Sequence, residues 1–97
     1  MSQGQKLLDQ KRDEILKIAG KYGASHVRVF GSVARGEDRI DSDLDLLVRF
    51  ERGRSLLDHA GLELELQELL GRKVEVASER GLRDRFRDRI LKEATPV

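Results

Sequence analysis

The chain has 97 residues, 38% apolar and 38% charged, with a mean hydropathy of −0.53, which suits one soluble domain spanning residues 1–97. A net charge of +1 and only four aromatic rings argue against direct nucleic-acid binding. The absence of cysteine excludes disulfides, thiolate catalysis and Cys-ligated zinc. No apolar run approaches the roughly 20 residues of a membrane span. Together these two features predict a cytoplasmic protein without membrane contact.

The first half of the chain predicts one helix, two strands and a short turn between them. Residues 5–20 carry apolar side chains at helical spacing and end in glycine. Residues 26–30 alternate between apolar and polar side chains, as a short strand does, until Gly31 interrupts the pattern. Residues 32–36 predict a single helical turn. A polar loop then leads to a second strand over residues 43–50.

The second half predicts a helix, a third strand and a final helix. Ser55 is a candidate N-cap for a leucine-rich helix that Gly71 ends, and its broad apolar surface predicts a well-buried helix. Residues 73–78 alternate as a strand, and residues 82–94 form an amphipathic helix rich in Arg and Asp. The order α-β-turn-β-α-β-α predicts an α/β (α+β) fold, with a mixed three-stranded sheet and flanking helices.

Three acidic residues are candidate metal ligands and catalytic residues. Asp43 and Asp45 lie two apart on a strand, so both point to one face of the sheet. Glu75 points away from the core on the third strand and completes the cluster if that strand lies beside the second. Carboxylates on neighbouring strands can hold two Mg²⁺ ions about 3.5–4 Å apart, an arrangement used for phosphoryl and nucleotidyl transfer.

A Gly-Ser turn twelve residues before the first Asp is a candidate nucleotide-binding element. Gly31 allows close approach of the backbone to a phosphate, and Ser32 and the amides that follow supply donors. Arg35 can neutralise charge on a triphosphate. A lone Gly-Ser is usually only a turn, and a lone Asp-x-Asp is often a solvated face. The conjunction of both with a third acid favours a nucleotide site.

The motifs Gly31-Ser32-Val33-Ala34-Arg35-Gly36 and Ser42-Asp43-Leu44-Asp45-Leu46 resemble those of the minimal nucleotidyltransferases of the DNA polymerase β superfamily. Nearly the whole chain is similar to the MntA-like antitoxins of HEPN/MNT toxin-antitoxin systems. The resemblance implies the minimal nucleotidyltransferase fold and Mg²⁺-dependent transfer of AMP from ATP to a tyrosine of a partner HEPN toxin. It implies triphosphate binding by Gly31 and Ser32 and metal binding by Asp43 and Asp45. The third family carboxylate is usually Asp, and Glu75 stands at that position.

Only 22 residues follow Glu75, which is enough for one helix but not for a second lobe that holds an acceptor. We therefore expect the acceptor to be a folded protein that docks beside the site and orients itself.

An alternative is a catalytically idle antitoxin that neutralises the toxin by direct binding through the Leu-rich or Arg-rich helix. Other acceptors, such as a small antibiotic or an RNA end, are disfavoured by the short chain. The sequence leaves open the nucleotide preference, the modified residue, the number of AMP units, the effect of Glu75 on activity, and the formation of homo- or hetero-oligomers.

Overall fold

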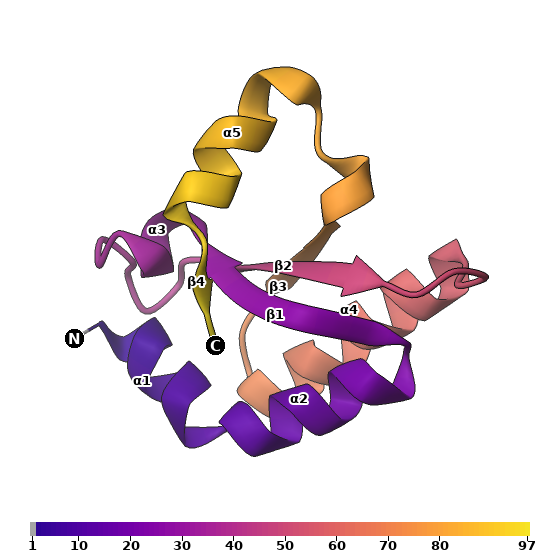
Figure 1. The fold of residues 1–97 in the computed structure, drawn as a ribbon. Coiled ribbons are helices and arrows are strands. Elements are labelled where there is room, and N and C mark those ends of the chain that lie inside the picture. The colour runs from indigo at the N-terminus through magenta and orange to yellow at the C-terminus, as the bar shows by residue number, and fades with distance from the viewer. Residues whose placement is uncertain (1) are drawn as a thin grey trace.

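The structure is a computed structural model, and it describes residues 2–97. A four-stranded sheet in the order β3-β2-β1-β4 lies between helices (Figure 1). In chain order the elements are α1 (Gln3–Gln10), α2 (Arg12–Lys21), β1 (Ala24–Phe30), α3 (Gly31–Ala34), β2 (Leu44–Phe50), α4 (Leu56–Leu70), β3 (Val74–Ser78), the 3₁₀ turn η1 (Glu79–Gly81), α5 (Asp84–Glu93) and β4 (Thr95–Pro96).

Helices cover both faces of the sheet. In Figure 1, α2 and α4 lie on one side of the strands and α5 lies on the other. The main core forms on the α2 and α4 side, from apolar residues that include Leu8, Ile15, Leu46 and Leu66, each no more than 1% exposed. Leu47 points to the opposite face and is also fully buried, so the α5 side is apolar at its centre.

The expected helix over residues 5–20 is two helices, which is a correction to the sequence analysis. Lys11 leaves the helical conformation, with φ −105° and ψ 12°, and separates α1 from α2. The six residues between Leu8 and Ile15 are all polar or charged, so no core contact spans this stretch and the chain can change direction there.

The prediction of a well-buried helix at α4 is only partly correct. The expected ends are confirmed, because Ser55 caps the first turn and Gly71 adopts φ 65° after the last. Leu62, Leu66 and Leu70 form one buried stripe at a spacing of four residues. The remaining leucines include three with large exposed fractions: Leu56 (85%), Leu57 (83%) and Leu64 (60%).

The sheet is mixed, as expected, but it has a fourth strand. β1 pairs antiparallel with β2, and β2 pairs parallel with β3. The additional strand β4 pairs antiparallel with β1, with Val29 opposite Thr95 and Arg28 opposite Pro96. Two residues that include proline give no period-two signal, and proline in a sheet is confined to edges. Sequence patterning therefore could not detect β4.

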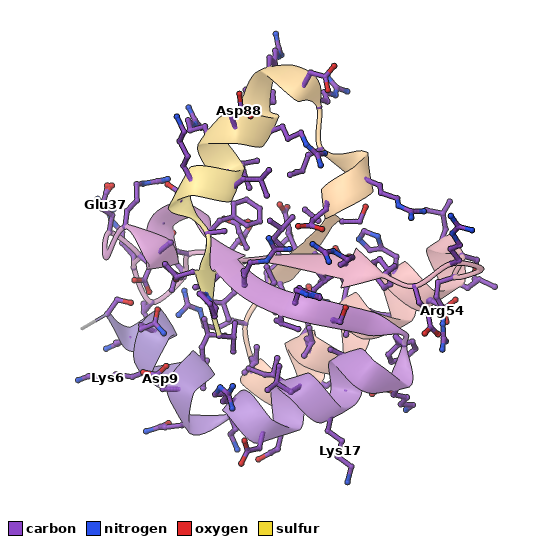
Figure 2. The ribbon with its side chains drawn as sticks, in the orientation of Figure 1. Lys6, Asp9, Lys17, Glu37, Arg54 and Asp88 are labelled. Carbon is purple, nitrogen blue, oxygen red and sulfur yellow. The ribbon has the colours of Figure 1, made fainter. Side chains whose placement is uncertain are left out.

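Charged side chains dominate the outer surface. Figure 2 shows Lys6, Asp9 and Lys17 extending from α1 and α2 away from the rest of the protein. Within residues 2–97, no helix is long and apolar enough to cross a membrane.

Candidate active site

The sheet brings together the acidic residues predicted from the sequence. In the parallel ladder of β2 and β3, Asp45 is directly opposite Glu75. Asp43 precedes β2 by one residue and lies two residues before Asp45. On the other side of β2, Asp45 is opposite Phe30, the last residue of β1. The carboxylates therefore lie where β1 ends and where β2 and β3 begin.

The Gly-Ser turn packs directly against the Asp45 carboxylate. Gly31 has φ 75°, a left-handed conformation that costs an L-residue free energy. A Cβ atom at Gly31 would also collide with the carboxylate oxygen Oδ2 of Asp45. Glycine is required here for both reasons. This contact places Ser32, the next residue, within the same site as the acids.

The electrostatic environment of Asp45 opposes its ionisation. Burial is the largest cause, and repulsion from Glu75 and then Asp43 adds to it, so the pKa of Asp45 rises from 3.8 to about 6. Arg35 acts in the opposite direction but does not cancel these effects. Glu75 and Asp43 are therefore close enough to oppose the ionisation of Asp45, and a bound cation would relieve that repulsion.

Lys73 lies close to two of the three acids. Its Nζ lies 3.8 Å from Asp43 Oδ2 and 3.8 Å from Glu75 Oε1. Across residues 2–97, no three His, Asp or Glu side chains are gathered into a ready-made metal site. The donor set nevertheless fits Mg²⁺, because it consists of carboxylate oxygens that already attract a positive group. Lys73 is exposed and flexible enough to move aside.

Glu93 contacts two of the three nucleotide-binding candidates, Gly31 and Arg35, and was not predicted as a site residue from the sequence. The Gly31 N–H donates to Glu93 Oε2 at 2.8 Å, and Arg35 Nη1 donates to Glu93 Oε1 at 2.6 Å. Arg35 also donates through Nε to Glu37 at 3.1 Å. Burial alone would raise the pKa of Glu93, but the Gly31 amide and the Arg35 guanidinium outweigh it and lower that pKa.

A second group missed by the sequence analysis holds the loop before β2. The side chain of Asp38 is fully buried, and it accepts a hydrogen bond from the Gly4 N–H at 3.0 Å. Arg72 Nη1 lies 3.7 Å from Asp38, and Arg72 Nη2 donates to the carbonyl groups of Arg39 and Ser42. No periodicity identifies such residues, because they contact the main chain of distant segments. They fix the loop that ends at Asp43.

With this geometry in place, comparison with known proteins assigns the family. The chain matches the nucleotidyltransferase domain family over residues 9–97 and belongs to that family, so it is a nucleotidyltransferase. It is 40% identical over 90 residues to "Putative protein adenylyltransferase MJ0435" of Methanocaldococcus jannaschii, covering 93% of this chain and 97% of that one. It is 39% identical to "Protein adenylyltransferase MntA" of Thermococcus cleftensis, covering 84% and 82%.

Two solved structures share the fold. "Structure of putative minimal nucleotidyltransferase" superposes with a TM-score of 0.87 at 55% identity, covering all of this chain and 97% of the other. The predicted minimal nucleotidyltransferase fold is therefore confirmed. "Crystal structure of the toxin-antitoxin with AMP-PNP" gives a TM-score of 0.75 at 17% identity, covering 87% of this chain and 69% of that one. At that identity the similarity concerns the fold alone.

Proposed function

We propose that this chain is a cytoplasmic antitoxin that transfers AMP from ATP to a tyrosine hydroxyl of a partner HEPN toxin in a Mg²⁺-dependent reaction. The names of its relatives support protein adenylylation, and the similarity of its motifs to those of MntA-like antitoxins supports the toxin as acceptor.

The observation that carries this proposal is the packing of the Gly-Ser turn on the acidic pair. Gly31 lies against Asp45, and Asp45 lies opposite Glu75 in the β2 and β3 ladder. A triphosphate held at Ser32 and Arg35 would therefore lie beside carboxylates. Asp43, Asp45 and Glu75 would hold Mg²⁺, which when bound neutralises charge on the phosphates and the attacking oxygen.

The proposed reaction is a displacement at the α-phosphorus of ATP. A bond forms between the tyrosine oxygen and the α-phosphorus, and the bond from that phosphorus to the bridging oxygen of the β-phosphate breaks. Diphosphate leaves with the electron pair of the broken bond, and the hydroxyl proton passes to a carboxylate of the cluster. Arg35 offsets negative charge on the departing diphosphate. The toxin orients its own tyrosine by docking.

The test is the intact mass of the partner toxin after incubation with this protein, Mg²⁺ and ATP. We expect a gain in units of AMP, lost when Mg²⁺ is chelated and lost in the Asp43→Ala, Asp45→Ala double variant. The matched control is Asp41→Ala, which removes an exposed carboxylate from the loop just before the pair and should leave the gain intact. A gain that persists in the double variant contradicts the proposal.

A second candidate function is neutralisation of the toxin by direct binding alone. The exposed side chains of Leu56, Leu57 and Leu64 on α4 favour it, because large exposed apolar groups commonly mark protein contacts. The same incubation separates the two functions. A stable complex that inhibits the toxin without any mass gain, in both the wild type and the double variant, identifies the binding function.

A further inference from the structure

Glu93 joins the last helix to the turn that we propose binds nucleotide. Its two carboxylate oxygens accept hydrogen bonds from two different groups, the Gly31 main-chain N–H and the Arg35 guanidinium, at 2.8 and 2.6 Å. These partners are 62 and 58 residues away in the sequence. The side chain is only 19% exposed, so water competes weakly for these bonds.

The sheet register explains why Glu93 reaches Gly31. β4 pairs antiparallel with β1, and the last rung joins Val29 to Thr95. One further step of two residues in the same register brings residue 93 opposite residue 31. α5 ends at Glu93, so the main chain cannot supply that rung. The Glu93 side chain supplies the acceptor in its place.

The two hydrogen bonds of Glu93 hold Gly31 at the start of α3 and Arg35 at its end. α3 has four residues, and the Arg35 N–H that ends it donates to the Gly31 carbonyl at 3.2 Å. A single turn is unstable by itself, because helix nucleation fixes several residues for one hydrogen bond. Gly31 adds to this cost, because a glycine loses more conformational entropy than other residues when its backbone is ordered. An external acceptor that holds both Gly31 and Arg35 therefore decides how well the turn is ordered.

We infer that Glu93 is a positioning residue for the nucleoside triphosphate, holding the Gly31-Ser32 turn and Arg35 in the orientation that receives the phosphates. This inference rests on the proposed function. It assigns the Gly31 amide to Glu93 and leaves Ser32 and the amides after it for the phosphates. It also makes α5 and β4 part of the nucleotide site, although Asp43, Asp45 and Glu75 all lie outside these two elements.

The test compares the steady-state kinetics of Glu93→Ala and Glu93→Gln with those of the wild type, using the partner toxin as acceptor. Alanine removes both acceptors, and we expect the KM for ATP to rise about tenfold, as for loss of hydrogen bonds to a charged group. Glutamine keeps one acceptor oxygen and is expected to raise it only about threefold. We expect the KM for the toxin and the kcat to change by less than about twofold.

The matched control is Glu37→Gln. Glu37 also bonds Arg35, but it is exposed, and none of its hydrogen bonds reaches Gly31; Figure 2 labels it beside α3. We expect its KM for ATP to stay within about twofold of the wild type. Thermal unfolding of each variant identifies a loss of folded protein, which lowers the apparent kcat without raising the KM for ATP alone. Glu93→Gln retains a hydrogen-bond acceptor and keeps the test informative if Glu93→Ala does not fold.

Two results would overturn the inference. One is an unchanged KM for ATP in folded Glu93→Ala. The other is a lower KM, which would mean that the carboxylate competes with the triphosphate rather than positioning its site. Both differ from failure of the proposed function, because in that case the wild type itself gives no AMP transfer.

Discussion

Asp45 is a carboxylate that the fold holds in an unfavourable place. It is half-buried, it lies beside Glu75 on the neighbouring strand, and its carboxylate fills the space beside Gly31. Its pKa rises from 3.8 to about 6, first through burial and then through repulsion by Glu75 and Asp43. Functional sites commonly carry such perturbed groups at a cost in stability, because the group has a task for which it must be charged.

We predict that Asp45→Asn stabilises the protein and abolishes the proposed AMP transfer. A carboxyl whose pKa is higher in the folded state costs stability as the pH rises from about 4 to about 6, and the full cost persists above this window. At pH 7 without Mg²⁺, we expect the free energy of unfolding to increase by about 1–2 kcal/mol, allowing for partial solvent screening. The difference between variant and wild type should vanish near pH 3.5. Urea unfolding at both pH values measures it.

The control for this prediction is Asp41→Asn, an exposed carboxylate four residues earlier. It should change the unfolding free energy by less than about 0.5 kcal/mol at either pH. A stability gain in Asp45→Asn that is equally large at pH 3.5 would show that packing, and not charge, limits the stability of the wild type at this position.

At the level of the elements, the junction of β1 and α3 sets the distance between the acids and the turn that we propose binds phosphate. Gly31 and Gly36 both adopt left-handed conformations, with φ 75° and 71°. They differ in their surroundings. A Cβ atom at Gly31 would meet Asp45, whereas a Cβ atom at Gly36 would have no neighbour within 4 Å. A substitution at Gly36 therefore measures the cost of the left-handed backbone alone, whereas a substitution at Gly31 adds the steric conflict with Asp45.

We predict that Gly36→Ala costs about 1 kcal/mol of unfolding free energy, which is the conformational cost alone. Gly31→Ala should cost about 2–3 kcal/mol, because Asp45 or the turn must also shift. Only Gly31→Ala should abolish AMP transfer. Denaturant unfolding together with the toxin mass assay checks both variants. Equal costs for the two substitutions would mean that the contact between Gly31 and Asp45 relaxes freely.

The sequence could predict the parts of this site that depend on strand patterning, but not the parts that depend on contacts between distant elements. Period-two alternation, a local property, placed Asp43 and Asp45 on one face and turned Glu75 away from the core. The condition that the third strand lies beside the second is met, because Asp45 is opposite Glu75 in the ladder of β2 and β3. Glu93 could not be predicted in this way. Its contact with Gly31 depends on the register of β4, which has two residues and no recognisable pattern. The contacts of Lys73 and Arg72 could not be predicted either, because their partners come close only in the folded chain.

At the scale of the whole molecule, residues 95–97 connect the end of α5 to β1 and α2. Val97 is buried at 8% exposure, and its N–H donates to the Val27 carbonyl at 3.0 Å. Its main-chain oxygen accepts from Arg12 Nε of α2 at 2.9 Å. In Figure 1, β4 descends from the end of α5 along β1 toward the N-terminal helices. The anchoring of Val97 therefore holds α5, and with it Glu93, against the Gly-Ser turn.

We predict that Val97→Asp both destabilises the fold and weakens the binding of ATP. A carboxylate at this buried position is expected to cost about 2–3 kcal/mol, because burial of an unpaired polar group is unfavourable. Release of β4 would free Glu93, so we expect the KM for ATP to rise, as we also expect for Glu93→Ala. Val97→Ala, which only shortens the side chain, should cost about 1 kcal/mol and leave the KM unchanged. Denaturant unfolding and kinetics at a temperature where all variants are folded measure the two effects. If Val97→Asp lowers stability but keeps the wild-type KM, then α5 holds Glu93 without the help of β4, because only a carboxylate still bonded to Gly31 and Arg35 would preserve the turn.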